Sequence, residues 1–365
     1  MKKKISVTRK RHRRRNYRRN KKSKGFKFLK PAIFLLGIII IFIIIYENNS
    51  RSDTFSSDGY YHNEKFKNHI IIKGIDVSYA QGNNINWKAL KKSGVDFVFI
   101  RAGYRGADSG KLHKDERFDA NIINAKKENL MVGAYIYSQA ISEKEAVEEA
   151  KFLKKLARKY KIDLPLTFDY EIYEGGRLEK AFNNGTLSKD KATKITLAFS
   201  DEIINSGFEP LIYGNKNFLS WKMDDKKLSK NTNVWVAQYN KRNTYKNDYQ
   251  FWQASDRFKF NHIKHKFDLN FWYVNKKSGY STLGKRPYFS RTIKNCIISL
   301  DKHNYIHNGS PICPEITVYD GKKPLNEGTD FTVSYAKNIN SGTGYIIING
   351  IGTYKDQVVE SFLIK

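Results

Sequence analysis

The sequence predicts an α/β barrel with an irregular second half, followed by a small all-β sandwich domain. Short apolar segments alternate with helical segments through the first five predicted strands, and three more strand candidates follow with little helix between them. This order is typical of a β/α barrel. After about residue 286 the helical periodicity ends, and strand-like runs alternate with turn residues, which indicates a sandwich.

Eight short apolar runs have the length of buried strands. They are Ile70–Asp76, Phe97–Arg101, Met131–Tyr137, Leu166–Tyr170, Pro210–Tyr213, Val234–Gln238, Gln250–Ala254 and Phe267–Phe271. The predicted helices are Trp87–Lys92, Phe118–Glu128, Ser142–Tyr160 and Lys189–Asn205. Ser142–Tyr160 is the clearest, because Ser142 and Glu145 have the spacing of a capping box.

The N-terminal region predicts a membrane anchor. Residues 1–30 contain sixteen Lys or Arg and no acidic residue, and residues 31–47 contain an unbroken apolar run, Ala32–Tyr46. The basic side of such a segment stays in the cytoplasm, so everything after about Glu47 is expected outside the cell. A cleaved signal peptide is the alternative, but YENNSRSDTF after the run has no small-residue cleavage site. An anionic-lipid role also explains the basic arm better than nucleic-acid binding does.

Charge and composition divide the remaining chain. The polar segment 48–69 is predicted to be a flexible linker, 70–278 the catalytic barrel and 286–365 the sandwich domain. Of the net charge of +30, residues 51–285 contribute +13. This milder excess suits an anionic polymer, although solubility alone also explains it.

Four carboxylates lie at or near predicted strand ends, where a barrel gathers its site. Asp76 ends the first strand, Asp169 and Glu171 end the fourth, and Asp268 lies in the eighth. Side chains at i and i+2 of a strand point the same way, so Asp169 and Glu171 share a face. Their repulsion keeps one protonated to higher pH, as a glycosidic general acid requires. A single D-x-E is common, and the inference therefore depends on the strand assignment.

Aromatic side chains gather at the same strand ends and can stack on the apolar faces of sugar rings; barrel core is the alternative. The candidates for substrate binding are Tyr79, Tyr104, Tyr137, Tyr213 and Trp252. Tyr137 and Trp252 stand at strand ends and are the better ones for a sugar cleft. For Trp235, inside a strand, core and site remain equally open.

Several chemistries find no support in the sequence. It contains no P-loop, HExxH, G-x-S-x-G or Gly-rich dinucleotide turn, so neither a cofactor nor a metal is expected. Cys296 and Cys313 form no CxxC pair. They can form a disulfide with each other outside the cell or remain buried thiols, and both possibilities stay open.

Eight separated segments resemble the family 25 glycoside hydrolases, the Chalaropsis-type lysozymes. They are GIDVSYAQG, INWKALKKSGVDFVFIRAGYRG, FDANIINAKKENLMVGAYIYS, PLTFDYE, PLIYGN, VWVAQYN, FWQAS and FDLNFW, between about residues 72 and 275. The resemblance implies a modified TIM-like barrel of five β/α units plus three strands. It also implies hydrolysis of the β-1,4 bond from N-acetylmuramic acid to N-acetylglucosamine in peptidoglycan.

Carried over by position, the resemblance implies roles for the four acids. Glu171 would be the general acid and Asp169 its partner, with Asp76 and Asp268 as flanking acids. The mechanism stays open, because two acids so close in sequence leave no separate nucleophile across the bond. Substrate assistance by the 2-acetamido group is the preferred hypothesis, one of the exceptions to the two-carboxylate scheme.

The C-terminal segment LNEGTDFTVSY…GTGYIIINGIGTYKD resembles the bacterial Ig-like repeats of Firmicute surface proteins. It contains no catalytic constellation. A wall-binding module and a structural spacer are equally open for this domain.

The sequence therefore predicts a membrane-anchored peptidoglycan hydrolase on a bacterial cell surface, with glycan strands as its partner and no nucleic-acid partner. Two alternatives are a non-enzymatic wall-binding scaffold on a retained barrel and a hydrolase of another N-acetylated glycan. The anchor also suggests partners in a cell-envelope assembly.

Overall fold

The structure is a computed structural model, and it describes residues 54–275 and 291–365. The chain divides into two compact units, Met1–Thr54 and Phe55–Lys365. The predicted cytoplasmic arm and anchor, 1–47, lie outside the described residues. Within those residues, no helix has the length and apolarity needed to cross a membrane.

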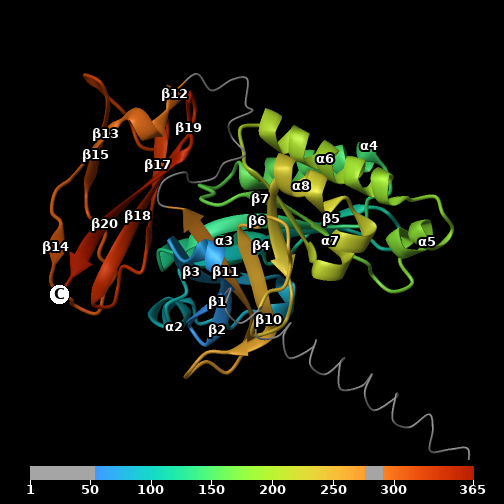
Figure 1. Cartoon of the computed structure of the whole chain (residues 1–365), viewed down its shortest axis with the longest axis horizontal. Helices are drawn as coiled ribbons and strands as arrows, with labels where there is room; N and C mark the ends of the chain where they lie inside the picture. Colours follow the sequence, from blue (N-terminus) through green and yellow to red (C-terminus); the bar gives the residue numbers. More distant parts are fainter. Residues whose placement is uncertain (1–53, 276–290) are drawn as a thin grey trace, which may run out of the picture. The chain divides into compact units, whose positions relative to one another are not determined.

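Eight strands close into a barrel (Figure 1). In barrel order they are β3 (His69–Val77), β4 (Phe97–Arg105), β6 (Met131–Ser138), β7 (Leu166–Tyr170), β8 (Pro210–Asn215), β9 (Asn233–Ala237), β10 (Phe251–Lys259) and β11 (Lys266–Asn275). A ninth strand, β5 (Leu112–Lys114), extends β4 outside the ring. All eight predicted strands are present, but β11 runs antiparallel to both β10 and β3.

Helices cover much of the outside of the barrel. They are α2 (Trp87–Lys92), α3 (Phe118–Lys127), α4 (Glu143–Ala157), α5 (Arg177–Asn183), α6 (Lys189–Asn205), α7 (Lys216–Lys222) and α8 (Asp225–Asn231). The Ser142 side chain caps α4 by accepting from the backbone N–H of Glu145, and the Glu145 carboxylate accepts from the N–H of Ile141. The predicted bounds of α2 and α6 are confirmed, whereas the short helices α5, α7 and α8 were not predicted.

The N-terminal segment covers β10 and β11 where no helix separates them. It forms β1 (Thr54–Ser57), β2 (Tyr60–Asn63) and the 3-10 helix η1 (Glu64–Phe66). The Tyr60 ring lies 5.1 Å from the Phe271 ring, and the Phe66 ring stacks on Tyr273 at 3.8 Å. Residues 54–69 therefore differ from the predicted flexible linker, because their aromatic residues close the outer face of the barrel.

Aromatic rings fill the barrel interior. Phe99 stacks on Trp235 at 4.6 Å, and Phe251 stacks on Trp272 at 5.5 Å. Gly133 makes room for this packing, because a Cβ there would lie 2.3 Å from the Phe99 ring. The interior is thus a packed floor, and the polar site can form only at the mouth above it.

The C-terminal region is all-β, as predicted. Its strands are β12 (Arg291–Thr292), β13 (Ile297–Leu300), β14 (Asn304–Tyr305), β15 (Ile316–Asp320), β16 (Lys323–Pro324), β17 (Phe331–Ala336), β18 (Gly342–Gly350), β19 (Tyr354–Lys355) and β20 (Gln357–Ile364). The sheets β14-β20-β18-β17 and β13-β15-β16 enclose a core that contains Val318, Ile346 and Phe362. Cys296 and Cys313 are free thiols.

Candidate active site

The four predicted acids line one cavity at the barrel mouth, which we name the acid cavity. Its volume is about 230 Å³. Asp76 lies near the end of β3, Asp169 in β7 and Glu171 directly after β7. The other lining residues are Arg101, Tyr135, Tyr137, Tyr213, Trp235, Tyr239, Gln253 and Asp268. The structure therefore brings together all four carboxylates that the sequence singled out.

Asp268 reaches the cavity for a reason that the sequence did not predict. It lies near the start of β11, whereas the other acids lie near the carboxyl ends of their strands. Because β11 is antiparallel to β3, its beginning meets the end of β3, and Asp268 pairs in register with Asp76. The reversed strand thus places a fourth acid beside the first.

Two buried amide side chains hold Asp76. Its Oδ2 accepts hydrogen bonds from Gln253 Nε2 at 2.8 Å and from Asn270 Nδ2 at 2.7 Å. Each amide oxygen accepts in turn from an aromatic donor: Tyr213 Oη donates to Gln253 Oε1 at 2.7 Å, and Trp235 Nε1 donates to Asn270 Oδ1 at 2.9 Å. These donors fix both amides with their N–H groups towards Asp76.

Asp76 and Asp268 form a coupled pair of acids. Burial, the charge of Asp76 and a hydrogen bond with it together raise the pKa of Asp268 to about 9. Burial also raises the pKa of Asp76, whereas the hydrogen bonds from Asn270 and Gln253 oppose the rise. Two carboxylates this close cannot both ionise easily. Asp268 therefore keeps the proton and Asp76 carries the charge.

Asp169 and Glu171 are the other two acids of the cavity, and their pKa values are raised as well. Burial, with a contribution from the charge of Asp76, raises the pKa of Glu171 to about 7. Burial and the charge of Glu171 raise the pKa of Asp169, while Arg101 lowers it. Glu171 is half-buried and lines the cavity, so it can hold a proton near neutral pH and deliver it to a bound molecule.

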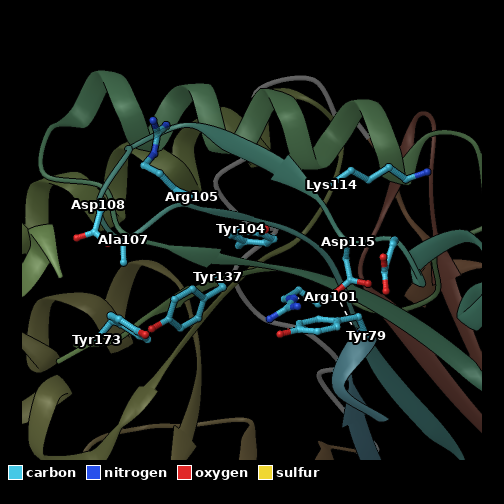
Figure 2. A pocket seen from close by; sticks show the side chains of 11 residues that line it. Tyr79, Arg101, Tyr104, Arg105, Ala107, Asp108, Lys114, Asp115, Tyr137 and Tyr173 are labelled. Carbon is cyan, nitrogen blue, oxygen red and sulfur yellow. Dashed lines mark hydrogen bonds and ion pairs between the residues drawn. The ribbon is translucent and has the colours of Figure 1, made fainter. Parts of the chain in front are cut away.

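The predicted substrate-binding tyrosines divide between two neighbouring cavities. Tyr213 is buried in the wall of the acid cavity, and Tyr137 lines both cavities. Tyr79 and Tyr104 line the second cavity, whose volume is about 600 Å³ (Figure 2). The acid cavity therefore opens beside a larger, tyrosine-rich pocket.

Trp252 was predicted to stand in the sugar cleft, and that prediction is wrong. Its side chain is fully buried on the outer face of β10, where Nε1 donates to the backbone oxygen of Gln238 and the ring lies 5.7 Å from Tyr60. Side chains alternate along a strand, so Gln253 faces the acid cavity and Trp252 faces away. The open question about Trp235 is resolved as both core and site, since it is buried and also lines the cavity.

Three polar residues of the site escaped the sequence analysis: Arg101, Gln253 and Asn270. Arg101 ends the predicted strand FVFIR, and Asn270 stands two residues after Asp268, so both are on the faces that alternation assigns to the interior. Polar residues at inward positions of strands were therefore the available signal. In the part of the chain that the structure describes, no group of three or more His, Cys, Asp or Glu can hold a metal ion.

Comparison with known proteins finds one family. The model of "Glycosyl hydrolases family 25" matches residues 75–263. The "Autolytic lysozyme" of Clostridium acetobutylicum is 26% identical over 168 residues, which are 46% of this chain and 45% of that protein. The chain thus spans about half the length of the curated relative that it matches.

Solved structures resemble the fold at low identity. A family 25 glycosyl hydrolase from Bacillus anthracis is 23% identical, covering 61% of this chain and 94% of that one, with a TM-score of 0.46. The modular autolysin LytC from Streptococcus pneumoniae, in complex with a synthetic peptidoglycan ligand, is 24% identical, covering 60% of this chain and 52% of that one, with a TM-score of 0.48.

Proposed function

This chain belongs to the glycosyl hydrolases of family 25, and on that premise we propose that it is an N-acetylmuramidase. Its substrate is the β-1,4 bond between N-acetylmuramic acid and N-acetylglucosamine in peptidoglycan. The observation that carries the proposal is the single cavity in which Asp76, Asp169, Glu171 and Asp268 meet. Four acids with one nearby guanidinium, Arg101, suit the cationic transition state of glycoside cleavage.

Glu171 is the general acid in this proposal. Its pKa of about 7 leaves a large protonated fraction at neutral pH. It donates that proton to the glycosidic oxygen as the bond from the anomeric carbon to this oxygen breaks. Deprotonation above pH 7 removes the donor, so the rate is expected to fall as the pH rises through this value.

Asp169 assists by holding the 2-acetamido group of the sugar. Its buried Oδ1 has no hydrogen-bond partner among the described residues, so it can accept from the acetamido N–H. The acetamido oxygen then forms a bond to the anomeric carbon while the leaving sugar departs with the proton of Glu171. Glu171, now a carboxylate, then takes a proton from water as the water oxygen bonds to the anomeric carbon and the bond to the acetamido oxygen breaks, so the anomeric configuration is retained. An inverted product anomer in an NMR time course would exclude this route.

The decisive experiment compares wall hydrolysis by the full chain and by Glu171→Gln. We expect release of reducing ends that carry N-acetylmuramic acid, identified by mass spectrometry, and loss of this release in the variant. Glu143→Gln, on the exposed start of α4, is the matched control. An active Glu171→Gln protein would refute the role of this acid, and other reducing-end sugars would favour a different N-acetylated glycan. A folded wild-type protein that binds walls without cutting them would favour a scaffold.

We also propose that residues 31–47 anchor the enzyme with its N-terminus in the cytoplasm and its barrel facing the wall. The apolar run between a basic arm and a polar segment supports this topology. Membrane fractionation and protease treatment of intact cells test it. Recovery of the barrel in the soluble fraction, or its protection from external protease, would contradict the topology.

The C-terminal sandwich is proposed to be an Ig-like module that either binds the wall or spaces the enzyme from it. Its all-β core supports the fold class. Co-sedimentation with cell walls, measured for the full chain and for a chain truncated after residue 285, separates the two roles. If the sandwich binds the wall, the truncated chain co-sediments less; if it is a spacer, both chains co-sediment equally. Co-purification from membranes tests for partners in a cell-envelope assembly.

A further inference from the structure

The pocket beside the acid cavity, which we name the side pocket, has the properties of a second recognition site. It has a volume of about 600 Å³ and shares Arg101 and Tyr137 with the acid cavity. Its lining also includes Tyr79, Tyr104, Asp108, Lys114, Asp115 and Glu116. The two cavities therefore adjoin at Arg101 and Tyr137.

Arg101 is held in a fixed position between the two cavities. Its Nε donates to Asp115 Oδ2 at 2.8 Å. The buried Asp115 carboxylate also accepts from the backbone N–H of Tyr79 at 3.1 Å and from that of Arg117 at 2.9 Å. Because Asp115 binds two loops as well as Arg101, the guanidinium is positioned before any ligand arrives.

Aromatic rings flank the same guanidinium. The Cζ atom of Arg101 lies 4.8 Å from the ring centre of Tyr79 and 5.4 Å from that of Tyr104 (Figure 2). The Tyr104 ring also stacks on His113 at 5.0 Å. Tyr79 holds this cation yet stays 53% exposed, so this part of the pocket offers N–H groups beside an aromatic face.

One terminal nitrogen of Arg101 has no acceptor among the described residues. Nη2 is buried without a hydrogen-bond partner, and Asp115 accepts only from Nε. Leaving a buried charged donor unsatisfied costs free energy, which a bound oxygen acceptor recovers. The guanidinium fork fits a carbonyl or carboxylate oxygen best.

The charges around the side pocket indicate what kind of acceptor. The exposed side chains of Lys114, Asp108 and Glu116 give the lining both signs of charge. Lys114 also pairs with Asp119, and Asp108 with Lys180. A sugar also hydrogen-bonds such side chains, but a short peptide adds carboxylates and amines that pair with both signs of charge. A cavity of this size holds a chain of roughly two or three amino acids, judged by typical ligand pockets.

We propose that the side pocket binds the peptide substituent of the glycan and that Arg101 donates to a carbonyl or carboxylate oxygen of that peptide. This inference rests on the proposed muramidase function and adds a specificity to it. The enzyme then prefers strands that still carry peptides over strands from which an amidase has removed them.

The test compares kcat/KM on soluble glycan oligomers of equal length with and without their peptides. For Arg101→Lys and Arg101→Gln we expect a loss of about tenfold or more on the peptide-bearing oligomer, the size of one charge-assisted hydrogen bond. The loss on the peptide-free oligomer is expected to be smaller, so the preference shrinks. Arg257→Gln, in an exposed ion pair outside both cavities, is the control and should keep the wild-type preference.

Two outcomes would overturn the inference. Equal losses on both oligomers, together with a shifted pH profile, would mean that Arg101 acts through the charge of Asp169. Unchanged kinetics on both would mean that it contacts no substrate group.

Binding separates this inference from the proposed function. Calorimetry on Glu171→Gln, with and without Arg101→Lys, measures affinity for both oligomers without turnover. If the wild-type chain cuts neither oligomer but affinity for the peptide-bearing one depends on Arg101, the function fails and the side pocket remains. If that affinity is independent of Arg101, the side pocket assignment fails, whatever the outcome for hydrolysis.

Discussion

Glu149 and Glu171 have the same raised pKa in very different surroundings. Burial raises the pKa of each carboxyl to about 7. Glu149 is fully buried in α4 with Arg105, whose Nε lies 2.5 Å from its Oε1. Glu171 is half-buried and lines the acid cavity, and the charge of Asp76 contributes to its raised pKa. A raised pKa alone therefore does not identify a catalytic acid; access to a cavity and the sign of the neighbouring charge do.

The largest difference between the two glutamates is expected in turnover when each is replaced by glutamine. We expect Glu171→Gln to lower kcat by about 10²–10⁴-fold, the usual contribution of a general acid. Glu149→Gln should keep near wild-type kcat per folded molecule, because it faces no cavity. Comparable losses of kcat in the two variants would mean that access to the acid cavity does not distinguish Glu171 from Glu149.

The second prediction concerns stability and reverses the ranking. Glu149→Gln replaces the carboxylate beside Arg105 Nε by a neutral amide, while Arg105 keeps Glu148 at 3.4 Å and Glu145 at 4.0 Å. We expect a loss of about 1–3 kcal/mol. Glu171→Gln removes an acid that is destabilised by its neighbours, so its free energy of unfolding should equal or exceed that of the wild type. Urea unfolding at pH 7 measures both. A Glu149→Gln protein as stable as the wild type would show that the ion pair is dispensable.

The third prediction uses the pH dependence of stability. Because the pKa of Asp268 is raised to about 9 in the folded chain, the folded state binds this proton more tightly than the unfolded state does. The contribution of Asp268 to stability is then greatest below about pH 4 and is lost as the pH rises to about 9. Asp268→Asn should flatten this slope in urea unfolding at pH 5, 7 and 9. The control is Asp256→Asn, because hydrogen bonding to Arg257 lowers the pKa of that carboxyl. Equal pH dependence of the unfolding free energy in the wild type and in Asp268→Asn would contradict the raised pKa of Asp268.

The smallest expected effect tests the relay behind Asp76. Tyr213→Phe removes the donor that fixes the Gln253 amide, and kcat should fall by several-fold, as expected for one hydrogen bond of about 1 kcal/mol. Tyr273→Phe is the matched control, because its hydroxyl bonds His62 on the outer face of the barrel. Equal activity of the two variants would remove Tyr213 from the positioning of Asp76.

Much of the fold could be predicted because its signals are local. Apolar runs marked all eight barrel strands, and β7 begins and ends at the predicted residues, Leu166 and Tyr170. The hairpin that contains Tyr60 was missed, since its few aromatic residues stand in a polar segment and are buried only against β10 and β11. Its burial depends on residues almost two hundred positions away, and no local pattern reports that.

Sequence patterns were enough to predict the barrel, the common face of Asp169 and Glu171, and the place of Asp76 at a strand end. These features follow from strand alternation and parallel strand order, which are local rules. The remaining features of the site depend on contacts between strands that are distant in the sequence. The antiparallel β11 brought Asp268 to Asp76, closure of the ring turned Gln253 inward and Trp252 outward, and Asp115 fixed Arg101 between two cavities. These outcomes depend on which strands become neighbours, and residues far apart in the chain decide that.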